Sequence, residues 1–312
     1  MSILPSKTLH GGSFKDIFIE VSHSESLNLR NPEQLRLFHL EVSNNQFSFN
    51  YLQKFIRKNI GQYVFSRAQI EEYELDDDAY SVGMDALDIM RANAKPGERD
   101  SGNDLGEILL YIFLEEVLGA PKILSKVELR AQSGSYDSEC DAIHFLASTN
   151  TSGNPYYNIV FGTSSIVGDV GDAIDAAFER IAKIHSKSEQ EILLAENTIF
   201  KKDVEKDTAI KIKDLLVPKK GARPSYDAAF GIFLAYDLGL NPDNYSNQEF
   251  ALKIEQKMQT DIKAHAQYII DKINGLGLGN YSFYIYFIPL NDVDNDKLQI
   301  MRSVFGKEST DE

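Results

Sequence analysis

The chain has 312 residues, 43% of them hydrophobic and 25% charged, which is ordinary globular composition for one large domain or two small ones. A net charge of −15 argues against a surface that coats nucleic acid broadly, but it does not exclude a local nucleic-acid site. The single cysteine excludes an internal disulfide, and neither a signal peptide nor an apolar run of about 18 residues is found. We therefore expect a cytoplasmic protein without a membrane segment.

The N-terminal part, residues 1–93, is predicted to be an α+β region. β-Forming residues predict strands at 14–21 and 35–42, and apolar residues at helical spacing predict a helix at 48–64. The acidic stretch at 71–78 favours a solvated loop or helix face over a metal cluster. A linker rich in helix and strand breakers follows at 94–103, and a second domain is predicted at 102–312.

The second domain is expected to begin with a helix–strand–strand–strand–helix unit over 102–185. Its helix at 104–118 has one apolar stripe, its first strand alternates apolar and polar residues, and its second is apolar on both faces. The elements are a helix at 104–118, strands at 122–131, 139–147 and 156–165, and a helix at 169–185. The later elements are helices at 188–200, 204–216, 247–274 and 294–304, a basic turn at 219–224, and strands at 227–236 and 281–288.

Two carboxylates in this unit are candidates for chemistry. Asp141 lies in an otherwise apolar strand, where a carboxylate is costly unless it is paired, hydrogen-bonded or bound to a metal. Glu107 lies in the first turn of the preceding helix, and converging carboxylates are what magnesium chemistry on phosphodiesters requires. Structural alternatives remain open, because Glu107 nearly completes a capping box with Asp104 and Asp141 can bind loop backbone.

Three sequence blocks resemble one family. They are Gly-Asn-Asp-Leu-Gly-Glu at 102–107 with the helix after it, Pro-Lys-Ile-Leu-Ser-Lys-Val-Glu-Leu at 121–129, and Asp-Ala-Ile-His-Phe at 141–145. Together they are similar to the HamA C-terminal domain family, and weaker likeness extends over roughly residues 35–305.

The resemblance implies an α/β fold of the restriction-endonuclease, or PD-(D/E)xK, type: a mixed sheet flanked by helices. HamA is the nuclease-fold subunit of Hachiman, a bacterial antiphage system, and its partner is a superfamily 2 helicase, HamB. The family pattern implies DNA cleavage with Mg²⁺ or Mn²⁺. Glu107 matches the helix carboxylate and Asp141 the first strand carboxylate, so both are implied metal ligands.

The chain departs from the family pattern on the third strand. Where the family has Gly-Glu-x-Lys, residues 162–165 read Gly-Thr-Ser-Ser, so Thr163 and Ser165 stand at the catalytic Glu and Lys positions. Three explanations are open: a degenerate site in a subunit that binds and regulates the helicase, substitutions in this sequence, or migration of the missing groups. Lys126 and Arg130 could supply the positive charge.

Two aspartates just past the third strand could supply a replacement carboxylate. They are Asp169 and Asp172, for which helix capping is the favoured interpretation. Three basic residues on the following helix, Arg180, Lys183 and Lys187, could line a DNA path, and a solvated helix face explains them equally well.

Overall fold

The computed structural model describes residues 6–10, 12, 14–93, 102–132, 138–149, 155–193 and 226–306. Most of the predicted linker, the predicted helix at 204–216 and the basic turn at 219–224 lie outside these residues. Within them, no helix is both long enough and apolar enough to cross a bilayer.

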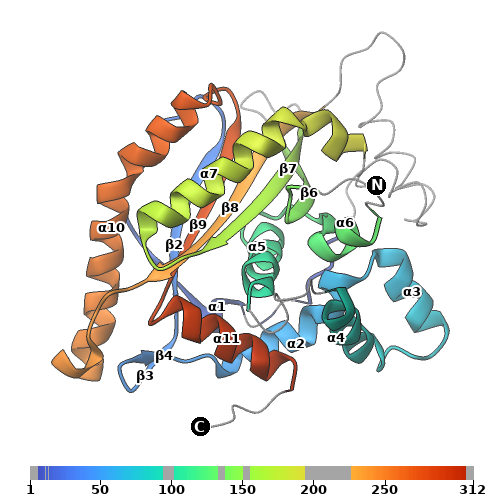
Figure 1. Cartoon of the computed structure of the whole chain (residues 1–312), viewed down its shortest axis with the longest axis horizontal. Helices are drawn as coiled ribbons and strands as arrows, with labels where there is room; N and C mark the ends of the chain where they lie inside the picture. Colours follow the sequence, from blue (N-terminus) through green and yellow to red (C-terminus); the bar gives the residue numbers. More distant parts are fainter. Residues whose placement is uncertain are drawn as a thin grey trace.

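A seven-stranded mixed sheet organises the molecule (Figure 1). In spatial order its strands are β1 (Phe18–Val21), β2 (Glu33–Leu40), β9 (Ser282–Leu290), β8 (Asp227–Asp237), β7 (Pro155–Ile166), β6 (Ala142–Thr149) and β5 (Lys122–Ser125). The four central strands, from β2 to β7, run parallel, and antiparallel strands complete both edges. The predicted α/β class with a mixed sheet flanked by helices is confirmed and is compatible with a nuclease-like core.

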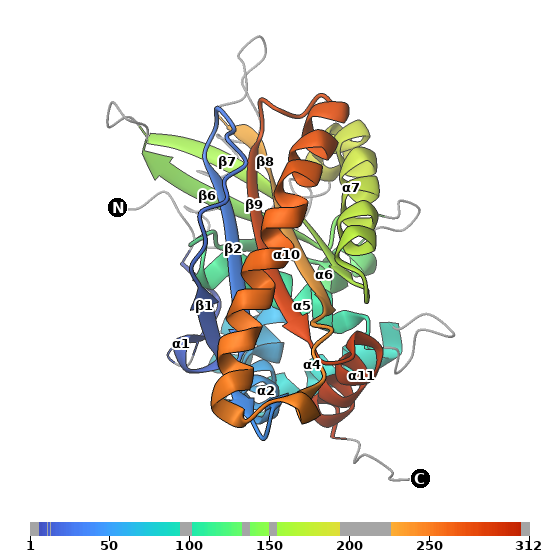
Figure 2. The ribbon, with the colours of Figure 1, turned by 90° about the vertical axis from the view of Figure 1, so that its left-hand side faces the viewer.

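Helices lie on both sides of this sheet (Figures 1 and 2). Helices α7 and α10 cover one face, α5 packs on the other, and α2, α4 and α11 gather around one end of α5. The helices are α1 (Phe14–Ile17), α2 (Asn50–Val64), α3 (Arg67–Leu75), α4 (Val82–Asn93), α5 (Asp104–Glu116), α6 (Lys126–Gln132), α7 (Val170–Ser186), α10 (Asn247–Gly275) and α11 (Val293–Val304), with a 3₁₀ turn η1 at Pro242–Asn244.

The central helix α5 is buried almost throughout, and this burial positions its first turn. The ring of Phe113 lies 5.0 Å from the rings of Phe18 and Phe38, centroid to centroid. Gly106 packs so tightly on β7 that a Cβ atom there would lie 2.9 Å from Ser164 Oγ. The close approach requires glycine, and it places the neighbouring Glu107 beside the third strand of the predicted unit.

Two strand predictions need correction. Residues 14–21 are not one strand, because the short helix α1 (Phe14–Ile17) precedes β1. The predicted strand at 122–131 ends at Ser125, and α6 begins at Lys126. A capping box explains this switch: Glu128 N donates to Ser125 Oγ at 3.2 Å, and Ser125 N donates to Glu128 Oε2 at 3.0 Å. The Ser-x-x-Glu signature was present in the sequence, but the apolar alternation favoured a strand.

The other predicted elements within the described residues lie close to their expected bounds, whereas the helices α3 and α4 have no counterpart among the predictions. The helices predicted at 48–64, 104–118, 169–185, 247–274 and 294–304 are α2, α5, α7, α10 and α11. The acidic stretch at 71–78 lies at the end of α3 and in the turn after it, as expected for a solvated segment. From the N-terminal region, β1 and β2 join the same sheet as the later strands, and β3 (Val42–Ser43) pairs with β4 (Gln46–Phe47) as a separate hairpin.

Candidate nuclease-type centre

The two predicted carboxylates lie at one place, where the first turn of α5 meets the start of β6 and the C-terminal part of β7. Asp141 immediately precedes β6, and its backbone N–H donates to Gly162 O on β7 at 2.8 Å. Glu107 comes from α5. The negative charge of Asp141 raises the pKa of Glu107, which is consistent with their closeness.

The carboxylate of Asp141 is buried and its two oxygens are both engaged. Oδ2 accepts hydrogen bonds from Ser164 N at 2.7 Å, Ser164 Oγ at 2.9 Å and Arg180 Nη1 at 2.8 Å. Oδ1 accepts a hydrogen bond from Arg180 Nη2, and Lys126 Nζ lies 3.8 Å from it. Burial by itself raises the pKa of this carboxyl, but the charges of Arg180 and Lys126 and the hydrogen bonds lower it overall. Asp141 is therefore an ionised carboxylate held by a bidentate arginine.

Glu107 has the opposite electrostatic character. Its Oε2 accepts a hydrogen bond from Tyr63 Oη at 3.2 Å, and its Oε1 lies 3.3 Å from Arg130 Nη2. Burial is the main cause that raises the pKa of Glu107, the charge of Asp141 adds to it, and Arg130 offsets part, leaving the pKa at about 8. At neutral pH this carboxyl therefore holds its proton in most molecules.

The hydrogen bonds to Asp141 among the described residues come from Ser164 and Arg180, and not from Thr163 or Ser165, which stand at the family's Glu and Lys positions. Thr163 is fully buried, and its Oγ1 has no hydrogen-bond partner among the described residues. Ser165 is 8% exposed. The residue between them, Ser164, is the one that binds Asp141, and sequence reasoning missed it. Strand alternation was the available signal, because Ser164 shares the face of Gly162, which packs on α5.

The two basic residues expected near the first strand do approach the carboxylates, but from a helix. Lys126 opens α6, and its Nζ donates to Ser138 O at 2.8 Å and Cys140 O at 3.0 Å, beside Asp141. Arg130, one turn later on α6, faces Glu107 and also lies 3.9 Å from Asp104 Oδ1. Lys126 and Arg130 therefore lie near the two carboxylates, but they come from α6 and not from the polar face of a strand, and their replacement of the missing lysine stays a prediction.

The candidate replacement carboxylates serve α7 instead. Asp169 is the N-cap of α7, and its Oδ1 accepts hydrogen bonds from Gly171 N at 2.7 Å and Asp172 N at 3.1 Å. Asp172 is exposed in the first turn of that helix, where a negative charge is favourable. The favoured interpretation of Asp169 as a helix cap is confirmed.

Arg180 is the feature of the centre that sequence analysis did not place. It projects from α7, and besides holding Asp141 it donates to Glu139 O at 2.8 Å and Ser164 O at 3.2 Å. Of the three basic residues proposed as a DNA path, Arg180 and Lys187 both form ion pairs inside the protein, the latter with Glu139 at 3.3 Å. No local sequence signal marks this role, because α7 reaches Asp141 only through tertiary packing.

A family model described as HamA matches residues 15–304. The chain belongs to the HamA family. A search of curated proteins finds no match. Family membership places this HamA chain among antiphage defence subunits, and it agrees with the resemblance seen in the three sequence blocks.

The donors of this HamA chain do not fit a magnesium ion. Mg²⁺ prefers near-octahedral oxygen ligands and usually one or two free carboxylates. Here both oxygens of Asp141 are already bound, by Arg180 and by Ser164, and are not free for a cation. Among the described residues, no group of three or more His, Cys, Asp or Glu side chains could hold a metal.

The charges of the centre lead to the same conclusion. Three acidic side chains face three basic ones: Glu107, Asp141 and Asp104 against Lys126, Arg130 and Arg180. With Glu107 protonated, two charged carboxylates face three cations, so the cluster has no net negative charge with which to attract a divalent cation.

Proposed function

We propose that this chain is a HamA subunit that acts in antiphage defence by binding, with its nuclease-type centre retained as an ion-paired structural cluster. The observation that carries the proposal is the bidentate Arg180–Asp141 pair, which occupies the carboxylate that a nuclease of this type would give to its metal. The partner suggested by the family is a superfamily 2 helicase of the HamB kind. In this proposal the chain binds and regulates that helicase, and the complex of the two proteins binds DNA.

A second function, metal-dependent DNA cleavage, is favoured by one observation. Glu107 and Asp141 converge with Lys126 and Arg130, which is how a nuclease centre with a migrated basic group would be arranged. For this function, the Arg180 guanidinium would have to leave Asp141 when DNA or the helicase binds. Arg180 has a partly exposed side chain, so this movement does not require the core to open.

A plasmid-cleavage assay separates the two functions. The purified chain is assayed alone and with its helicase partner and ATP, in Mg²⁺, Mn²⁺ or EDTA. We expect no metal-dependent cutting under any condition, and unchanged helicase binding. Cutting that Asp141→Ala abolishes would contradict the proposal, provided that the exposed-carboxylate control Asp172→Ala retains it and the melting temperature shows that the variant is folded.

The variant Arg180→Gln sharpens this test because it releases Asp141 without removing it. Manganese binding is measured by paramagnetic broadening of backbone amide signals near Asp141, which does not depend on activity. The binding function predicts no local broadening in the natural sequence. Broadening and cutting that arise only in Arg180→Gln would mean that the centre is a nuclease held closed by this arginine.

A further inference from the structure

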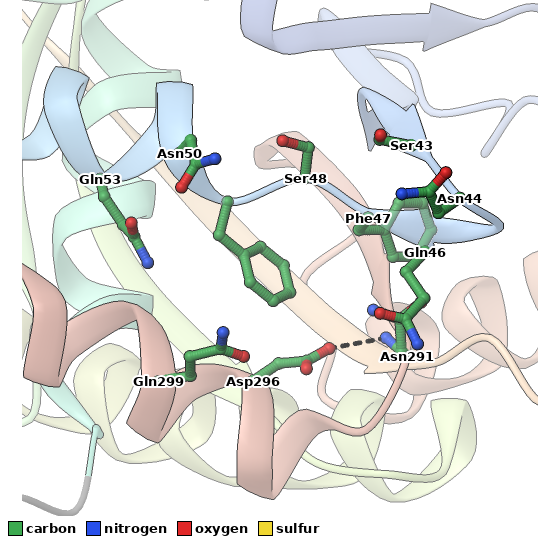
Figure 3. A pocket seen from close by; sticks show the side chains of 11 residues that line it. Ser43, Asn44, Gln46, Phe47, Ser48, Asn50, Gln53, Asn291, Asp296 and Gln299 are labelled. Atoms are coloured by element: carbon green, nitrogen blue, oxygen red, sulfur yellow. Dashed lines mark hydrogen bonds between the residues drawn. The ribbon is translucent and has the colours of Figure 1, made fainter. Parts of the chain in front are cut away.

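A polar pocket lies at a different place from the centre described above. Its cavity volume is about 370 Å³, and it lies between the β3–β4 hairpin and the N-terminal turns of α2 and α11 (Figure 3). This volume is near the lower end of the roughly 300–1,000 Å³ range of ligand pockets, which suits one small molecule or one residue of a chain. No residue of the centre around Glu107 and Asp141 lines this pocket.

Carboxamide side chains dominate the pocket. Figure 3 shows Asn50 and Gln53 reaching in from α2, Gln299 from α11, and Gln46 from the hairpin. These four side chains, and that of Asn44, make no hydrogen bond to another described residue. Each carboxamide offers a carbonyl acceptor and two N–H donors in one plane. The pocket is therefore equipped for a flat ligand that has donors and acceptors along its edges.

A buried carboxylate adds one directional group. Asp296 is 7% exposed, and its Oδ2 accepts hydrogen bonds from Asn291 N at 2.8 Å and Asp292 N at 3.2 Å. Both bonds end on Oδ2, so Oδ1 retains the capacity to accept a hydrogen bond from an amino group of a ligand. Burial raises the pKa of this carboxyl, as expected where a carboxylate is shielded from water.

Two further features define the ligand. Phe47 and Phe49 are the aromatic side chains among the described residues that line the pocket, and at 4% and 8% exposed they form the apolar part of its lining. Phe49 is also the N-cap residue of α2, and no side chain caps that helix. The first N–H groups of α2 are then available to a carbonyl or ring-nitrogen acceptor.

The lining residues include no Lys, Arg or His, and Asp296 is the one acidic residue among them. A phosphate or another anion would therefore meet a carboxylate without a compensating cation, which excludes an anion as the group that the pocket selects. Nucleobases combine a flat ring with edges of donors and acceptors, and Asn and Gln pair with such edges in two hydrogen bonds.

We propose that the pocket between the β3–β4 hairpin, α2 and α11 binds a single nucleobase, read by Gln53, Gln299 and Asp296 beside the apolar lining of Phe47 and Phe49. The base can belong to a free nucleoside or to an unpaired nucleotide of a strand, because the recognised edge is the same in both. The inference goes beyond the proposed function and does not depend on it, since no residue of the centre takes part.

The first test titrates the full chain with adenosine, guanosine, cytidine and thymidine, followed by calorimetry and by the backbone amide signals of the pocket. At least one nucleoside should bind, with an affinity that changes little with salt because no phosphate is bound. Ribose and N-acetylglycinamide serve as probes for a sugar site and a peptide site. Binding of either in place of the nucleosides, or no nucleoside binding, overturns the proposal.

Variants then locate the binding. Gln53→Leu and Gln299→Leu should each weaken nucleoside binding by about tenfold, since each removes a pair of edge contacts. The matched control is Gln267→Leu, an exposed glutamine on α10 that hydrogen-bonds to Asp271 at 2.8 Å, and it should leave binding unchanged. Equal binding by all three variants would contradict the assignment.

Hexanucleotides with and without a single abasic position distinguish the source of the base. Stronger binding of the complete strand than of the nucleoside, lost at the abasic position, identifies an unpaired nucleotide. Binding of the nucleoside alone identifies a free metabolite. The variant Asp141→Ala should bind as the natural sequence does in both cases, so that failure of the proposed function leaves this result unaffected.

Discussion

Two buried ionic clusters flank β5, and they differ in how their charges are satisfied. In the first, the Nζ atom of Lys122, 1% exposed, donates to Tyr63 O, Phe65 O and Glu128 Oε2 at distances of 2.8 to 3.0 Å. All three ammonium protons are used inside the protein. In the second, Asp141 and Glu107 are buried but their arginine partners keep 28% and 26% of their side chains exposed.

The difference teaches that a buried charge does not by itself mark a functional site. The Lys122–Glu128 cluster fixes the turn from β5 into α6 to the end of α2, and both side chains are buried. In the second cluster the two carboxyls have pKa values moved in opposite directions, and their partners border solvent. Two neighbouring carboxyls whose pKa values are shifted in opposite directions, and whose arginine partners are partly exposed, form an arrangement that can respond to a ligand.

The largest effect is expected when the enclosed cluster is broken. Lys122→Met leaves Glu128 buried without its cation and should lower the free energy of unfolding by about 3–5 kcal/mol, as measured by urea denaturation. Lys272→Met is the control, because its partly exposed pair with Asp175 should contribute less than about 1 kcal/mol. Equal losses in the two variants would show that the two kinds of pair do not differ as described.

A smaller and pH-dependent effect is expected at Glu107. Its pKa is raised on folding, so the folded state binds a proton that the unfolded state releases, and stability falls as pH rises from about 4.5 towards about 8. Glu107→Gln removes this titration and should be more stable than the natural sequence at pH 8 by roughly 2–4 kcal/mol relative to their difference at pH 5. Parallel stability curves over this pH range would contradict the raised pKa.

The smallest effect is expected at Asp141, whose partner Arg180 keeps 28% of its side chain exposed. Asp141→Asn should lower the free energy of unfolding at pH 7 by about 1–3 kcal/mol, because the charged hydrogen bonds to Arg180 and Ser164 weaken. The pKa of Asp141 is lowered on folding, so its contribution is present above the ordinary value of 3.8 and lost as pH falls below it. The two unfolding curves should therefore converge in acid.

The sequence alone determined the fold class, the positions of the long helices and the two central carboxylates. Hydrophobic periodicity specifies which face of a segment is buried, and an aspartate in an apolar strand is conspicuous because its burial has to be compensated. The motif blocks also indicated the family that the family match then showed. The catalytic roles of Thr163 and Ser165, and the division of the chain at about residue 100, remain predictions.

Only the tertiary structure decided what surrounds the carboxylates. Arg180 lies 39 residues after Asp141, and the pair exists because α7 packs across β7. The local switch from β5 to α6 depended on a capping box competing with strand alternation, and the same residues support both patterns. An ion pair between residues far apart in the sequence forms only when whole helices and strands pack together. That packing depends on many core residues and not on any local sequence pattern.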